Sequence, residues 1–326
     1  MDQPHLSQWV HVARDAQEVT NHSEEVSSYL WTPLLYIFKK IMKKIPTLLF
    51  ISLALLMLHS ACGSVPGQTK AEKAGWKLSM QSYTLHRFTA VEALDKTQQL
   101  GLKFIEIYPG QKMGAEFGDA VFGYSLTESD QAKLKDMAAS RGIRIISSGV
   151  WTAKREEWEK IFRFARSMEL EFISAEPALD DWDLVEELSR EHAIKVAVHN
   201  HPSENSYWKP EILLQAIDGR SELLGSSADI GHYKRMGLDP LECVKQLEGK
   251  IISFHFKDIA PQGSEGTLED VVWGTGLLQV DQILKELKRQ QFEGYFTIEY
   301  EANWENNLPE IQESIDYFNK VVDTFM

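Results

Sequence analysis

Four short stretches of the sequence place histidines and charged side chains two or three residues apart. In order, they contain His199 and His201, Asp229 and His232, His255 and Lys257, and Glu299 and Glu301. Side chains two apart on a β-strand point to the same face, so the pairs spaced by two can act together if they lie on strands. Imidazoles and carboxylates bind divalent cations and transfer protons. These stretches are therefore the candidate site.

Composition excludes several other kinds of site. The chain has 326 residues, of which 43% are hydrophobic and 25% charged, as is typical of a folded globular protein. Two cysteines cannot build a disulfide framework or a cysteine-based zinc site, so a metal would need histidines and carboxylates. The net charge of −14 argues against the basic surface that polyanions require, so nucleic acid is not an expected partner.

The segments that must position these residues alternate between β-rich and helical stretches after Gly75. Eight runs have the pattern of strands: 77–84, 104–109, 143–151, 172–176, 195–201, 225–229, 251–258 and 295–301. Amphipathic stretches between or after them include 89–100, 157–168, 182–192, 240–247, 280–289 and 309–326. Strand starts recur about every 30 residues, which is the length of a βα repeat.

Eight βα units predict a closed (β/α)8 TIM barrel, a single domain over residues 76–326. The alternative is an open doubly wound sheet, which would place a glycine-rich phosphate loop after the first strand. The sequence there, SMQSYTLHRF, has no glycine, so the barrel is favoured. In a barrel the site forms at the carboxyl ends of the strands.

Reading only those strand ends adds Glu176, at the end of the fourth strand, to Asp229, His255 and Glu299. Three carboxylates and one imidazole that converge from different strands make an oxygen-rich site for one divalent ion. Mn²⁺, Mg²⁺, Co²⁺ and Zn²⁺ all suit such a site, and the sequence does not choose among them.

Three motifs follow one another on consecutive predicted strands: Asp229-Ile-Gly-His232, His255-Phe-Lys-Asp258 and Ile298-Glu299. Together they resemble the xylose isomerase-like barrel superfamily, which includes sugar phosphate isomerases/epimerases and endonuclease IV. The likeness runs from about Lys77 to the end and includes FTAVEALDKTQQLGLKFIEIYPGQ and WGTGLLQVDQIL. It implies that Glu176, Asp229, His255 and Glu299 hold the metal.

One departure lies on the fifth strand. Several epimerase branches have a carboxylate where this sequence has His199-Asn200-His201, which resembles the inosose dehydratase branch. We expect the ion to bind a keto-sugar or an oxidised glycoside through its carbonyl and a neighbouring hydroxyl. Loss of the adjacent proton would then lead to isomerisation, epimerisation, dehydration or glycoside elimination.

The candidate catalytic residues are Glu176, Glu299 and His201 as possible bases, with Lys257 to stabilise the oxyanion. Because four ligands from other strands already surround the ion, we expect His201 to transfer protons without binding the metal.

Further residues are expected to contact substrate, although each also has a structural interpretation. His199 could instead orient a ligand carboxylate, and His232 could cap the turn after its strand. Glu106 could pair with a cation inside the barrel, and Trp208 could stack on a sugar ring or pack within its loop. Glu301 is expected to be a solvated charge at the rim.

Residues 42–61 have the pattern of a secretory signal peptide. Two lysines precede the mostly apolar residues 45–58, a run shorter than the roughly 20 residues of a membrane span, and Ser60-Ala61-Cys62 is similar to a bacterial lipobox. A membrane anchor or a buried helix is the alternative. We expect residues 1–41 to be an over-called upstream start, Cys62 to carry a lipid, and 62–75 to form a tether.

These features predict an exported bacterial lipoprotein of the periplasm or cell envelope, in contact with the membrane only through Cys62. Its partner would be a small carbohydrate, and an oligomer is compatible with the sequence. Two rival functions remain. One is a surface lipoprotein that binds carbohydrate without turnover, and the other is an endonuclease IV-like phosphodiesterase, which the negative charge disfavours.

Overall fold

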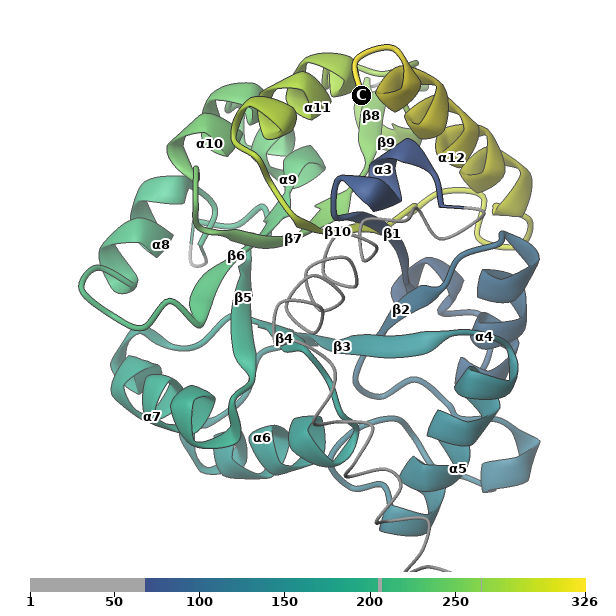
Figure 1. The fold of residues 1–326 in the computed structure, drawn as a ribbon, viewed down its shortest axis with the longest axis vertical. Helices are drawn as coiled ribbons and strands as arrows, with labels where there is room; N and C mark the ends of the chain where they lie inside the picture. The colour runs from purple at the N-terminus through teal and green to yellow at the C-terminus, as the bar shows by residue number, and fades with distance from the viewer. Residues whose placement is uncertain (1–67, 205–206, 265) are drawn as a thin grey trace, which may run out of the picture. The chain divides into compact units, whose positions relative to one another are not determined.

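The structure, a computed structural model, describes residues 68–204, 207–264 and 266–326 (Figure 1). The upstream start predicted for residues 1–41, the signal peptide predicted for 42–61 and the lipid predicted on Cys62 lie outside these residues. Within the described residues, no helix has the length and hydrophobicity needed to cross a membrane.

Eight parallel strands form a closed barrel, which confirms the predicted TIM barrel (Figure 1). Around the barrel the order is β1, β10, β7, β6, β5, β4, β3, β2, and the last strand pairs with the first: Trp76 lies opposite Gly294 and Met80 opposite Ile298. The strands are β1 (Trp76–Gln81), β2 (Phe104–Ile107), β3 (Arg144–Trp151), β4 (Phe172–Ala175), β5 (Lys195–His199), β6 (Leu224–Asp229), β7 (Ile251–Phe256) and β10 (Gly294–Ile298).

Helices surround this barrel because each buries one apolar face against it (Figure 1). In α11, for example, Val280, Ile283, Leu284 and Leu287 are buried, at the spacing of one helical face. The helices are α3 (Lys70–Lys73), α4 (Ala90–Gln99), α5 (Glu128–Ser140), α6 (Trp158–Ser167), α7 (Trp182–His192), α8 (Pro210–Ala216), α9 (Ile230–Arg235), α10 (Pro240–Gln246), α11 (Val280–Arg289) and α12 (Leu308–Asp323). Short 3-10 turns include η2 (Ser82–Leu85) and η5 (Leu179–Asp181).

The barrel interior changes from apolar to polar along the strands. Near the strand starts, Phe172 and Tyr295 pack with Ile146 and Ala197 in a small buried cluster. Two and four residues beyond Tyr295, on the same face of β10 and its continuation, are Thr297 and Glu299. This apolar cluster therefore fills the barrel at the strand starts, and polar side chains lie inside it at the strand ends.

An antiparallel hairpin between β7 and α11, formed by β8 (Asp258–Gln262) and β9 (Thr267–Val271), was not predicted. It follows directly on Asp258, which the sequence analysis placed at the end of the seventh strand. The Asp258 carboxylate accepts hydrogen bonds from the backbone N–H groups of Ile259, Gly274, Gly276 and Leu278 at 2.9 to 3.1 Å. A Cβ on Gly276 would lie 2.3 Å from Asp258 Oδ1, so the glycine is required there. The HFKD and WGTG segments are therefore one structural unit.

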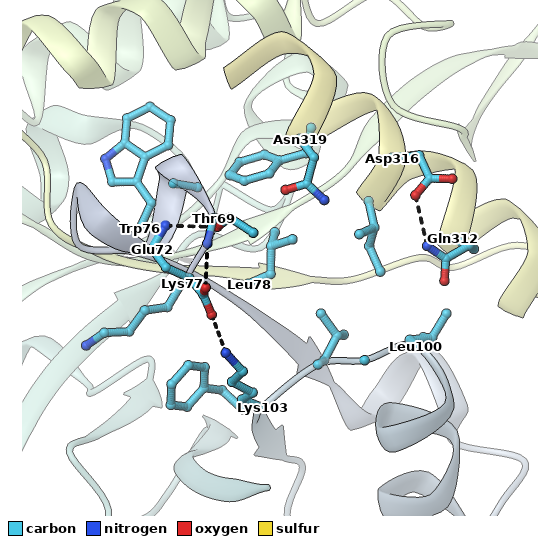
Figure 2. A pocket seen from close by; sticks show the side chains of 16 residues that line it. Thr69, Glu72, Trp76, Lys77, Leu78, Leu100, Lys103, Gln312, Asp316 and Asn319 are labelled. Carbon is cyan, nitrogen blue, oxygen red and sulfur yellow. Dashed lines mark hydrogen bonds and ion pairs between the residues drawn. The ribbon is translucent and has the colours of Figure 1, made fainter. Parts of the chain in front are cut away.

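The other end of the barrel carries α3, within the 62–75 stretch predicted as a tether. Thr69 and Glu72 form a capping box at the start of this helix, and Ala71 is buried. A cavity of about 270 Å³ lies beside it, lined by the first residues of β1 and β2 and by α12 (Figure 2). Lys103 Nζ pairs with Glu72 Oε1 at 2.6 Å across this cavity.

Candidate active site

Four potential ligands converge at the carboxyl ends of neighbouring strands. His199 ends β5, Asp229 ends β6, His255 lies in β7 and Glu299 directly follows β10. One ligand atom from each of these residues lies within 4.8 Å of the others, and all four residues are buried. The cluster therefore has the size and depth of a metal site.

Several polar atoms of this group are unsatisfied. His199 Nε2, Asp229 Oδ2 and His255 Nδ1 are buried and have no hydrogen-bond partner in suitable geometry among the described residues. Leaving buried polar atoms unpaired is costly, so their convergence indicates a missing partner. Two imidazole nitrogens and two carboxylates fit a divalent cation of the Zn²⁺ or Mn²⁺ type.

Lys257 balances the negative charge of the cluster. Its ammonium lies 3.1 Å from Asp229 Oδ2, 2.8 Å from Glu299 Oε2 and 2.9 Å from Glu301 Oε2, and the side chain is fully buried. Burial lowers the pKa of Lys257, but these carboxylates outweigh it and raise the pKa well above its usual value. A Cβ on Gly231 would lie 2.6 Å from the Lys257 side chain, which explains the glycine of the DIGH segment.

Behind His255 lies a fully buried carboxylate, Glu106. Its Oε1 is 2.7 Å from His255 Nε2 and accepts a 2.6 Å hydrogen bond from Gln81, and its Oε2 accepts one from Ser174 at 2.7 Å. Burial alone would lower the pKa of His255, but Glu299 and Glu106 raise it to about 10. Glu106 therefore orients His255 so that Nδ1 faces the cluster, which agrees with the predicted pairing with a cation inside the barrel.

Glu176 belongs to a second group of potential ligands, with His199 and His201. Its Oε1 lies 2.5 Å from His201 Nδ1 and 3.4 Å from His199 Nδ1. Burial would raise the pKa of Glu176, but hydrogen bonds from both imidazoles lower it to about 2. His199 thus links the two groups, and the structure does not bring Glu176 into the four-residue cluster.

The capping role considered for His232 belongs to Asp229, whose Oδ1 accepts the backbone N–H of His232 at 2.7 Å at the start of α9. The ring of His232 lines the cavity described below. Nε2 of this ring lies 3.6 Å from Asp229 Oδ2.

A cavity of about 450 Å³ opens above the cluster. It is lined by Gln81, Tyr83, Tyr108, Pro109, Gly149, Val150, His199, His201, Pro202, His232, Glu299 and Glu301. Trp208, predicted to stack on a sugar, is not among the lining residues, and the ammonium of Lys209 lies 5.1 Å from the centre of its ring. Glu106 and Lys257 also lie behind the cavity wall rather than in it.

Sequence reasoning missed Gln81, Tyr83 and Asp270. Gln81 ends β1, so the rule of reading strand ends could have found it. Asp270 lies on the unpredicted β9 and accepts hydrogen bonds from Arg235 at 2.7 Å and from the backbone N–H of Glu301 at 2.9 Å. No local signal in the sequence pointed to that residue.

The cavity beside α3 is a less suitable site (Figure 2). It lies at the strand starts, and the groups of potential metal ligands found among the described residues include none of its side chains. The candidate active site is therefore the cavity at the strand ends.

Comparison with known proteins agrees with the barrel fold. Residues 94–321 match the family described as xylose isomerase-like TIM barrel. No curated protein is similar to the chain. The structure of an uncharacterised protein from Parabacteroides distasonis has 37% sequence identity and a TM-score of 0.63, and the match covers 76% of this chain and 99% of that one.

Two more distant structures share the fold. A D-tagatose 3-epimerase-like protein has 17% identity and a TM-score of 0.60, over 76% of this chain and 97% of its own. The IOLI protein, solved with a bound zinc atom, has 16% identity and a TM-score of 0.63, over 77% of this chain and 99% of its own.

Proposed function

Because the chain belongs to the xylose isomerase-like TIM barrel family, we propose that it is a divalent-metal-dependent enzyme acting on a keto-sugar or an oxidised glycoside. The proposed step is removal of a proton from the carbon next to a carbonyl. Isomerisation, epimerisation and elimination all begin with this step, and the proposal covers these three outcomes.

One observation carries the proposal: three buried atoms of His199, Asp229 and His255, none with a hydrogen bond in suitable geometry, converge with Glu299 at the base of the cavity. We assign these four residues as the ligands, with His199 in the place that the sequence analysis gave to Glu176. A divalent ion there would supply Lewis acidity toward a carbonyl and a neighbouring hydroxyl.

His201 is the proposed proton-transfer group. It lines the cavity, its side chain is 46% exposed, and its Nδ1 lies 2.5 Å from a Glu176 oxygen. This contact supports a tautomer with the hydrogen on Nδ1, in which Nε2 carries the lone pair that a general base requires. Glu176, which stays ionised at neutral pH, holds the ring in place.

Lys257 supports the same chemistry from behind the wall. Because its ammonium is buried among three carboxylates, we propose that it reduces their mutual repulsion and does not contact the substrate oxyanion directly. His232 lines the cavity beside His201 and is the proposed hydrogen-bond partner of a substrate oxygen.

The cellular setting is a further part of the proposal and rests on the sequence alone. The signal pattern of residues 42–61 and Cys62 support an exported lipoprotein of the periplasm or cell envelope. Such a protein would meet free sugars and products of glycan breakdown.

The test is elemental analysis of the purified full chain, followed by incubation with ketoses and 3-keto-glycosides in D₂O. We expect one divalent ion per chain and exchange of the proton next to the carbonyl, measured by ¹H NMR, and we expect chelation to abolish both. Asp229→Asn should lose the ion and the exchange, and Asp281→Asn, in α11 and outside the cavity lining, should keep both. Full metal occupancy without proton exchange on any sugar would contradict the proposed enzymatic function and favour a protein that binds carbohydrate without turnover.

A further inference from the structure

The charge of the cavity wall restricts what can bind. Among the described residues that line the cavity there is no lysine or arginine, and two, Glu299 and Glu301, are carboxylates. Recognition of a phosphoryl group normally requires a cation or a cluster of N–H donors. Lys257 is fully buried and already paired with three carboxylates. A phosphorylated sugar would therefore meet two carboxylates and no lysine or arginine on this cavity wall.

The opposite wall is aromatic. Tyr83 lies in η2, directly after β1, and Tyr108 follows β2, so both belong to the side of the barrel across from β5 and β6. Tyr83 is 41% exposed. Its ring stacks on His86 at 5.0 Å between centroids and meets the edges of Tyr108 at 5.3 Å and Trp304 at 6.1 Å.

The backbone around Tyr83 is fixed by the site itself. The N–H of Tyr83 donates to Gln81 Oε1 at 3.1 Å, and the same Gln81 side chain donates to Glu106 at 2.6 Å. Asn307, after β10, donates to Thr84 O at 2.9 Å and so joins the loop that carries Trp304 to η2. An aromatic ring that is partly exposed but held in place in this way is preorganised for a ligand.

We propose that the cavity binds an unphosphorylated glycoside, with its reacting ring at the histidine and carboxylate cluster and its second ring against Tyr83. This inference rests on the proposed function and names its substrate class. The C–H face of a sugar ring is apolar and carries partial positive charge, which matches the negative face of an aromatic ring. A cavity of about 450 Å³ is within the usual range for ligands larger than a single ring.

Binding measured without turnover tests the proposal. The full chain loaded with Mn²⁺ is titrated calorimetrically with neutral disaccharides, the matched monosaccharides and the corresponding monosaccharide 6-phosphates. We expect at least one disaccharide to bind about tenfold more tightly than its monosaccharides, and the 6-phosphates to bind more weakly than the unphosphorylated sugars.

Variants at Tyr83 then locate the second ring. Tyr83→Leu and Tyr83→Ala should remove the disaccharide advantage and leave monosaccharide binding unchanged, whereas Tyr83→Phe should keep it. Leu179→Ala is the matched control, because Leu179 is 67% exposed, lies after β4 at the same end of the barrel and does not line the cavity. Circular dichroism verifies that each variant is folded.

The outcomes separate this inference from the proposed reaction. Equal loss of mono- and disaccharide binding in Tyr83→Leu, or tighter binding of the 6-phosphates, would overturn the inference even if proton exchange is observed. Absence of exchange on every sugar, together with a Tyr83-dependent preference for disaccharides, would sustain the binding inference while the proposed reaction fails.

Discussion

Arg235 donates a hydrogen bond to Nδ1 of His232, with 3.0 Å between the two nitrogens. Because a guanidinium can only donate, Nδ1 must be the acceptor, and the ring hydrogen of a neutral His232 is then on Nε2. That atom faces Asp229. Arg235 is itself held by Asp270 at 2.7 Å, so the β8–β9 hairpin sets the orientation of a cavity-lining histidine.

Loss of this donor should therefore change substrate binding more than protein stability. We expect Arg235→Met to raise KM about tenfold or more, since a hydrogen bond from a charged donor contributes about 1.5–3 kcal/mol. Arg235→Lys should show a smaller rise in KM than Arg235→Met. ¹⁵N NMR of the His232 ring gives a readout independent of turnover: the hydrogen should be on Nε2 in the parent chain and distributed over both nitrogens in Arg235→Met. An unchanged ring spectrum would show that Arg235 does not fix the tautomer.

The identity of the fourth ligand can be measured directly. His199→Gln should lose the metal, because His199 Nε2 is one of the unpaired atoms in the cluster. Glu176→Gln should keep the metal and lose activity, since the amide cannot hold His201 as a carboxylate does. Metal content by elemental analysis separates the two variants. The reverse result would show that Glu176 is the fourth metal ligand, as predicted from the sequence.

His201→Asn should retain the metal and bind substrate nearly normally. Removal of a general acid or base typically lowers turnover by about 10²- to 10⁴-fold, and we expect kcat to fall by that amount. Steady-state kinetics and metal analysis on one preparation give both quantities. Turnover close to that of the parent chain would leave His201 with a structural role only.

Asp258 is expected to matter for stability and not for chemistry, because its carboxylate serves four backbone N–H groups. Asp258→Ala leaves those donors without a partner and should reduce the free energy of unfolding by about 2–4 kcal/mol. Urea unfolding followed by fluorescence measures this change. Asp281→Ala removes only a partly exposed i,i+4 ion pair with Lys285 in α11 and should change the stability by about 0.5 kcal/mol or less.

The buried Cys243 thiol gives a prediction for alkaline pH. Burial raises its pKa to about 12 from about 9, and the nearby Glu211, Asp239 and Glu242 add to the shift. Because the pKa of the thiol is higher in the folded than in the unfolded chain, its contribution to the stability of the folded state is fully present below pH 9. This contribution is lost as the pH rises toward 12. At pH 8, Cys243 in a Cys62→Ser chain should resist iodoacetamide until urea unfolds the protein. Rapid labelling of the native chain would contradict this burial.

The barrel was predictable because its strands carry continuous buried runs, such as Phe172–Ala175, in which every residue is buried. The β8–β9 hairpin was not, since its strands are partly exposed and one of them contains a proline. The ligand assignment depended on where each strand ends. His199 shares the inward face of β5 with Ala197, whereas Glu176 lies one residue past the end of β4 and contacts His199 and His201. Strand parity is visible in a sequence, but the last residue of a strand depends on tertiary packing.

The position of α3 has a practical consequence. This short helix precedes β1 at the strand starts, beside the cavity of Figure 2, and the candidate active site lies at the strand ends. A bead, a sensor surface or a bulky fluorophore attached just ahead of Thr69 would therefore be on the side of the barrel away from the mouth. Immobilisation at this position should leave the mouth open to bulk solution, even for ligands as large as an oligosaccharide chain.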